Sequence, residues 1–171
     1  FDRVSLDEVS STAGVHRTTL HRTFPGGRDE LVAAVLEHEV EVLATGALAL
    51  IDAAPTQTEA FLDAITHAVE IGRRSQVVGA VLADPGFRPT ALAVAADRLR
   101  SASEALWQAI LARPANGARQ RSLTPERVAD HVLRVVLSLV ENQRGVGDAE
   151  AIRTYVADFV APAVLVPAPR A

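Results

Sequence analysis

The sequence contains no cysteine, no lysine and no methionine among its 171 residues. The absence of cysteine excludes disulfides, thiolate catalysis and sulfur-ligated metal sites. All 17 residues of the lysine–arginine class are arginines, which excludes Schiff-base chemistry and a Walker-type phosphate loop. Aromatic residues make up only 4% of the chain, so an internal ligand pocket would have mainly aliphatic walls.

Long uninterrupted apolar runs are also missing, although 49% of the residues are hydrophobic. None approaches the ~20 residues that a helix needs to span a bilayer, and no secretory signal is visible. We therefore expect no membrane partner, and we predict cytoplasmic residence. The length fits one or two small domains with a buried core.

Two short helices joined by a tight turn are predicted near the N-terminus by the segment SLDEVSSTAGVHRTTLHRTF. Ser5 and Glu8 form an S-x-x-E capping pattern, which predicts that the first helix begins directly after Ser5. Gly14 falls where this helix must end and the chain must take a left-handed turn. Val15 is expected to be the buried residue of that turn.

The second short helix has a polar outer face that lacks acidic residues. His16 is expected to open it, and Leu20 and Phe24, four residues apart, are expected to point inward. An outer face of arginine, threonine and histidine suits the major groove, where Arg recognises guanine and Thr contacts phosphate or a thymine methyl. The predicted DNA contacts are Ser5, Arg17, Thr18, Thr19, His21, Arg22 and Arg28.

The alternative interpretation of this segment is an ordinary helical hairpin on the surface of an all-α domain. The formal net charge of −4 does not decide between the two. Residues 16–28 carry three arginines, two histidines and no acid, and a local basic surface is sufficient for phosphate contact.

Every later segment that shows a pattern is helical. The apolar spacing and the Pro, Gly and Asp breaks predict helices over residues 28–51, 56–74, 75–83, 89–112 and 125–143, and from Asp148 to about residue 160. Residues 113–122 are predicted to form a polar loop, and residues 161–171 an extended tail. No strand pattern or internal repeat is present, so the predicted fold class is all-α.

Three segments of the chain resemble the DNA-binding domain of the TetR family of transcriptional repressors: VSLDEVSSTAGV, RTTLHRTF and FPGGRDELVAAVL. The resemblance runs from Phe1 to about Val40. It implies a helix-turn-helix DNA-binding domain at residues 1–30 and an all-helical ligand-binding and dimerisation domain at residues 31–171. The implied function is a ligand-responsive repressor that binds a palindromic operator in double-stranded DNA.

The sequence departs from the family pattern at several positions. Ser10 stands where members usually carry Ala, and His16 where they carry Ser or Thr. His21 stands in place of a Tyr that touches phosphate, and the following loop has one extra residue, with Arg28 as its cation. These departures affect the details of operator contact more than the fold.

Members of the family carry a further helix before this point, and we expect that helix to be missing from a sequence that begins at Phe1. The absence of methionine agrees with this expectation. Without that helix, Val9, Val15, Leu20 and Phe24 would lose part of their cover.

The resemblance also implies a ligand chamber among the middle helices and a dimer interface formed by the last two. Each chamber residue taken singly is more often ordinary core. The stripes of the last two helices could simply line the core of a single chain, but we favour the dimer interface because a helix-turn-helix binds DNA best as a two-fold pair. A small, apolar effector and a homodimer are the implied partners, with no cofactor and no metal. The expected chamber residues are Phe61, Ile65, Val69, Val78, Leu82, Phe87, Leu99 and Trp107; the expected interface residues are Val128, Val132, Val136, Leu139, Ile152, Tyr155, Val156 and Phe159.

Enzyme signatures are weak, and we expect no enzymatic activity. His38 lies among Glu37, Glu39 and Glu41, and His67 lies three residues before Glu70. Either group could bind a metal, but a solvated helix face explains both more simply. The sequence has no H-E-x-x-H, no paired Glu-x-x-His and no G-x-S-x-G. The competing function is an all-helical small-molecule-binding or catalytic protein that does not bind DNA.

Overall fold

The computed structural model describes residues 5–115, 117–119 and 123–167. Within these ranges the chain is helical apart from loops and one short pair of strands, so the predicted all-α class is confirmed. No helix in the described ranges is long and apolar enough to cross a membrane. The longer helices are α3 (Arg28–Ala53), α4 (Gln57–Arg74), α6 (Arg88–Ala112) and α7 (Pro125–Glu141).

The two short N-terminal helices are α1 (Leu6–Ala13) and α2 (Arg17–Thr23). The predicted capping box is present: the Ser5 hydroxyl accepts the Glu8 N–H at 3.2 Å, and the Glu8 carboxylate accepts the Ser5 N–H at 3.0 Å. Gly14 ends α1 in the left-handed conformation, with φ +65°. Local capping chemistry therefore gives both helix boundaries, as the sequence predicted.

One expectation for this region is wrong. Val15 is 41% exposed rather than buried in the turn, because no element in the described ranges covers it. Leu20 is the buried apolar residue of the α1–α2 pair, and Phe24 is only half-buried. The pair therefore has little hydrophobic core of its own.

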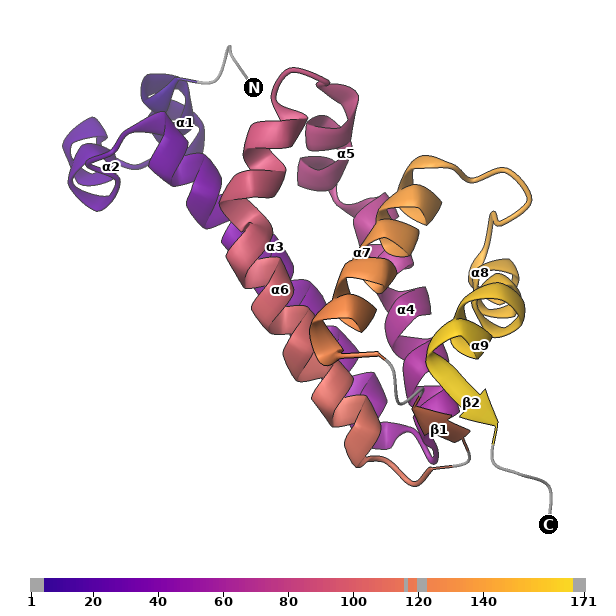
Figure 1. The fold of residues 1–171 in the computed structure, drawn as a ribbon. Helices are drawn as coiled ribbons and strands as arrows, with labels where there is room; N and C mark the ends of the chain where they lie inside the picture. The colour runs from indigo at the N-terminus through magenta and orange to yellow at the C-terminus, as the bar shows by residue number, and fades with distance from the viewer. Residues whose placement is uncertain (1–4, 116, 120–122, 168–171) are drawn as a thin grey trace.

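The long helix α3 connects the N-terminal pair to the rest of the molecule. In Figure 1, α1 and α2 lie at the N-terminal end of α3, while α6 runs beside α3 along most of its length. At 26 residues, α3 is about 39 Å long. The predicted domain boundary between residues 30 and 31 falls in the first turn of this continuous helix.

The main core gathers around α4, which packs against α3, α6 and α7. The predicted stripe of Phe61, Ile65, Val69 and Gly72 is buried, as its 4-4-3 spacing requires. At Gly72, α4 and α7 approach each other closely. A Cβ added to Gly72 would lie only 2.8 Å from Cγ2 of Val140 on α7.

A short helix, α5 (Gln76–Ala83), follows α4, and three short helical segments close the fold: α8 (Ala149–Tyr155), the π-helical turn η1 (Val156–Val160) and α9 (Ala161–Val164). The side chain of Asp148 caps α8 by accepting the Ala151 N–H at 2.8 Å. The last helix was predicted to end near residue 160, but helical structure continues to Val164.

The expectation of no strands is also corrected. Strand β1 (Gly117–Arg119) pairs antiparallel with β2 (Leu165–Pro167), with Ala118 opposite Val166. Part of the predicted loop and part of the predicted tail therefore pair with each other. Val164 and Leu165 are buried at the start of this segment, and their burial favours its docking. Residues 116, 120–122 and 168–171 of the predicted loop and tail lie outside the described residues.

Candidate DNA-binding surface and ligand cavity

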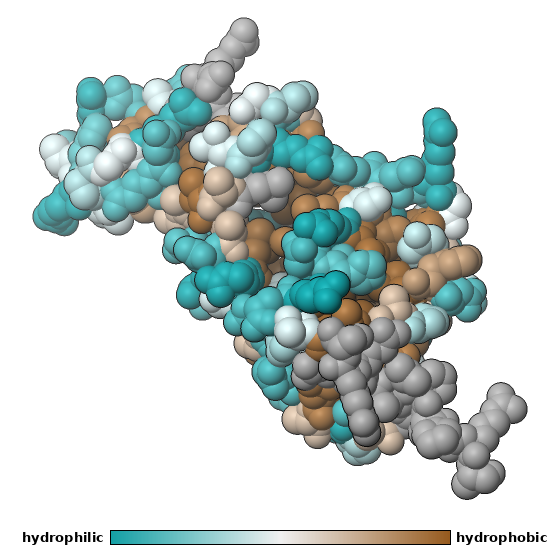
Figure 2. All heavy atoms as spheres, viewed as in Figure 1, coloured by the Kyte–Doolittle hydropathy of each residue, from teal (hydrophilic) through white to brown (hydrophobic). Residues whose placement is uncertain are grey.

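Helix α2 presents the predicted recognition face. Its candidate DNA contacts Arg17, Thr18, Thr19, His21 and Arg22 are all exposed. Figure 2 shows mainly hydrophilic side chains over α1 and α2. The structure therefore leaves this face free to meet a partner.

An acid from α1 reaches this face, which the sequence pattern did not indicate. The Asp7 carboxylate pairs with Arg17 at 2.8 Å, and both side chains are more than half exposed. Arg17 also donates to Nε2 of His21 at 3.4 Å. The guanidinium is thus held in place by neighbours that a base or a phosphate would have to replace.

Three other candidate contacts have roles within the chain. The Ser5 hydroxyl forms part of the α1 cap. Oγ1 of Thr18 lies 2.8 Å from Nδ1 of His16, which also accepts the Thr18 N–H. Arg28 is half-buried in the first turn of α3 and is therefore less available to phosphate than Arg22.

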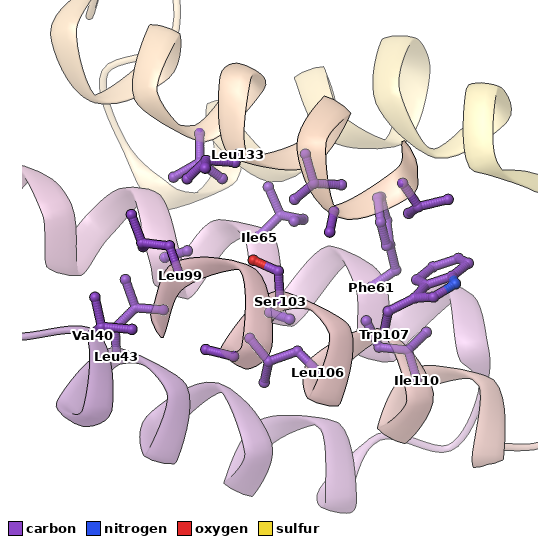
Figure 3. Close-up of a pocket in the computed structure, with 17 residues that line it drawn as sticks. Val40, Leu43, Phe61, Ile65, Leu99, Ser103, Leu106, Trp107, Ile110 and Leu133 are labelled. Carbon is purple, nitrogen blue, oxygen red and sulfur yellow. The ribbon is translucent and has the colours of Figure 1, made fainter. Parts of the chain in front are cut away.

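An apolar cavity of about 90 Å³ lies among α3, α4, α6 and α7. Figure 3 shows Leu99 and Leu133 at one end and Phe61, Trp107 and Ile110 at the other. The hydroxyl of Ser103 is the polar side-chain group among the labelled residues that faces this space. We call this cavity the inner chamber.

A second apolar cavity of about 120 Å³ adjoins the first and extends toward α5. We call it the outer chamber. Glu39 is its single charged lining residue, and the Glu39 carboxylate already accepts a hydrogen bond from the Ser75 hydroxyl at 2.6 Å. The two chambers share six lining residues: Val40, Leu43, Ala68, Leu99, Leu133 and Val136.

Most of the expected chamber residues do line these cavities. Phe61, Ile65, Leu99 and Trp107 line the inner chamber, and Val78, Leu82 and Leu99 line the outer one. Two expectations are corrected. Val69 is completely buried in the main core, and Phe87 packs beside the smaller core cluster of Leu36, Val81, Ala91 and Ala95. Neither is among the residues that line the two chambers, although the cluster beside Phe87 does line the outer one.

Helix α7 supplies wall residues that the sequence analysis had assigned to a dimer interface. Val132 and Val136 line the inner chamber, together with Val128. Leu133, which was not predicted at all, lines both chambers. The apolar stripe of α7 shows that the helix is buried, but a stripe does not identify the element against which it packs.

Val128 and three further expected interface residues, Leu139, Ile152 and Val156, are buried within the single chain. Each is at most 6% exposed, so the core of the chain already covers them. Tyr155 and Phe159 remain available at 37% and 69% exposure. Their rings contact each other with centroids 5.2 Å apart.

The candidate metal groups do not assemble into a site. Within the described ranges no group of three or more histidine or acidic side chains could hold a metal ion. Glu37, His38 and Glu41 lie exposed on α3. His67 packs against Gly46, and desolvation by burial lowers the pKa of its imidazole, while Glu70 raises it and Arg74 lowers it.

Comparisons of this chain with protein-family models, with curated proteins and with solved structures find no match.

Proposed function

We propose that this chain is a TetR-like transcriptional regulator, a ligand-responsive repressor that binds a palindromic operator as a homodimer. Helix α2 would enter the major groove, with Arg17 at the bases and Arg22 at phosphate. The two chambers would hold a small apolar effector.

One observation carries this proposal: a single helix joins the two candidate sites. Helix α3 begins at Arg28, beside the end of α2, and its Val40 and Leu43 form part of the wall of both chambers. Because the helix is continuous, a tilt needed to fit a ligand would also move the recognition helix.

The alternative is an all-helical ligand-binding protein that does not bind DNA. Two observations favour it: the α1–α2 pair buries little apolar surface, and the Arg17 guanidinium already forms an ion pair with Asp7. Under this alternative, the basic face of α2 is an ordinary solvated surface.

Selection from a random double-stranded DNA library separates the two functions. The full-length protein should enrich a two-fold symmetric sequence, and binding should weaken steeply as salt rises, because phosphate contacts release counterions. Arg17→Ala should cost about 1–3 kcal/mol of operator affinity if Arg17 contacts a guanine edge.

Arg98→Ala is the matched control, since Arg98 is exposed on α6, away from the recognition helix. It should leave both the enriched sequence and the affinity unchanged. If no sequence is enriched, or if Arg17→Ala behaves like Arg98→Ala, the alternative is favoured.

A further inference from the structure

A groove lies between α6 and α7 and shares lining residues with both chambers. It has a volume of about 300 Å³ and shares Leu99, Ser103 and Leu133 with the inner chamber. In Figure 2, hydrophobic side chains are visible between these helices, bordered by hydrophilic ones. Leu99 and Leu133 line the groove and both chambers.

We infer that the groove and the two chambers form one route for a neutral aliphatic ligand with a single hydrogen-bonding end, such as a medium-chain alcohol. The ligand enters between α6 and α7 and passes the side chains of Leu99 and Leu133. Its hydrocarbon chain fills the chambers, and its polar end stays beside Ser103. This inference names the ligand class of the proposed regulator. It rests on the proposed function only for the claim that the ligand regulates DNA binding.

The chamber walls exclude a charged group. They are formed by aliphatic and aromatic side chains. The polar side-chain groups of the lining residues are the Ser103 hydroxyl, the Trp107 indole N–H, which is buried without a partner among the described residues, and the already bonded Glu39 carboxylate. Burying an unpaired charge there would be very costly. The part of the ligand inside the chambers is therefore hydrocarbon.

Ser103 supplies a specific polar contact at the junction. It lines both the groove and the inner chamber, and its hydroxyl points from α6 toward the space between the helices (Figure 3). This hydroxyl makes no hydrogen bond to the residues that the structure describes. A ligand hydroxyl at this level could donate to it or accept from it.

The groove disfavours a carboxylate as the polar end. Asp97, Glu126 and Asp130 line it, and Arg100 is the single basic residue of the lining, while Arg134 pairs with Asp130 at 2.8 Å. Arg100 is already paired with Asp97 at 3.0 Å and with Glu104 at 3.4 Å. An anionic headgroup would meet like charge here, whereas a neutral alcohol would not.

The volumes set the length of the hydrocarbon. Each chamber, at about 90 and about 120 Å³, is smaller than the cavity of about 150 Å³ that takes one benzene molecule in another protein. A chain that passes Leu99 into both chambers gains contacts that a shorter molecule cannot reach. Each added methylene should strengthen binding about fourfold until both chambers are filled.

Calorimetric titration of the full chain without DNA tests the inference. The probes are 1-hexanol, 1-octanol and octanoate. We expect saturable binding of both alcohols, about fifteenfold tighter for 1-octanol than for 1-hexanol, and octanoate at least tenfold weaker than 1-octanol. Absence of saturable 1-octanol binding, equal affinity for the two alcohols, or equal affinity for octanoate would each overturn the inference.

Two variants with matched controls test the route. Leu99→Trp should reduce 1-octanol affinity at least tenfold by filling the junction, whereas Val94→Trp, at a residue 44% exposed on the same helix, should not. Ser103→Ala, a change small enough to preserve folding, should weaken 1-octanol about fivefold through one lost hydrogen bond. Exposed Ser101→Ala should have no effect.

Equal losses in a variant and its control would overturn the assigned route. These titrations contain no DNA, so a negative result would count against the ligand route and not against DNA binding. A negative DNA selection would count against the proposed repressor and not against the ligand route.

Discussion

Gly46 on α3 and His67 on α4 meet so closely that a Cβ added to Gly46 would overlap the imidazole ring. This contact lets the two helices approach each other just beyond the chambers. Gly46→Ala should therefore lower the free energy of unfolding by about 1–3 kcal/mol through overpacking, partly offset by the better helix propensity of alanine. Chemical denaturation measures the change.

Gly79→Ala is the control, because nothing lies within 4 Å of a Cβ at that position in α5. It should stabilise the protein by up to about 1 kcal/mol. In the His67→Ala background the penalty of Gly46→Ala should disappear, and a penalty that persists there would show that the imidazole is not its cause.

The same histidine makes stability depend on pH. Burial lowers the pKa of His67 below its ordinary 6.5, with Glu70 opposing the shift and Arg74 adding to it. The folded state therefore favours the neutral ring. This contribution is complete above pH 6.5 and is lost as the pH falls through the folded-state pKa.

His67→Gln should remove this part of the pH dependence, as measured by denaturation at a series of pH values. His21→Gln, on the exposed face of α2, should retain it. A wild-type profile that His67→Gln leaves unchanged would contradict the assignment.

Arg73 holds the end of α7 and the loop that follows it. Its guanidinium donates to the carbonyl of Leu139 at 2.8 and 3.2 Å, to that of Val146 at 2.7 Å and to that of Gly147 at 3.2 Å. Arg73→Ala should cost about 2–3 kcal/mol of stability, as for hydrogen bonds to a charged group. Arg73→Lys should recover only part of this stability, because an ammonium group lacks the planar, forked set of N–H donors of the guanidinium.

The neighbouring Arg74 provides the comparison in a denaturation experiment. It is exposed and pairs with Glu70 four residues earlier on the same helix. Arg74→Ala should change stability by no more than about 0.5 kcal/mol. Similar losses at the two arginines would indicate that charge, and not the carbonyl contacts, sets the effect.

The sequence predicted those features that depend on local chemistry. The Ser5–Glu8 capping box and the left-handed Gly14 involve neighbours within a few residues, so the pattern contains all the information needed. The buried stripe of α4 followed from its spacing for the same reason. Helix existence was therefore predictable almost throughout.

Features that depend on long-range contacts were not predictable in this way. The pairing of Asp7 with Arg17 joins two helices, and the periodicity of each helix says nothing about the other. Val136 shows the same limit: its stripe predicted burial, but a chamber wall and a dimer interface give the same pattern. The β1–β2 pair was missed because three-residue strands are too short to show alternation.

Phe159 and Tyr155 form the exposed aromatic surface that remains for a dimer interface. Phe159→Asp should dissociate the proposed dimer, because it would place an unpaired charge in the interface. It should not unfold the chain, since Phe159 is 69% exposed. Sedimentation velocity at micromolar concentration measures the association, with exposed Val94→Asp on α6 as the variant that leaves it intact. In the proposed dimer the two α2 helices would lie about 34–36 Å apart, one turn of DNA. A monomeric wild-type protein would contradict this arrangement.

Coupling between the chambers and DNA is the last prediction. Val40 and Leu43 belong to the same helix whose N-terminus lies next to α2. If 1-octanol fits best when α3 is tilted, it should lower operator affinity by about 5–150-fold, a coupling of about 1–3 kcal/mol.

Thermodynamic reciprocity requires operator DNA to weaken 1-octanol binding by the same factor. Trp107 is the sole tryptophan and lines the inner chamber, so its fluorescence can follow the titration with and without the selected operator. Arg17→Ala, at a residue that lines neither chamber, should reduce the effect of added operator without changing the affinity for 1-octanol alone. Equal 1-octanol affinities in the two wild-type titrations would exclude coupling, because a ligand that binds both states of α3 equally well cannot shift the balance between them.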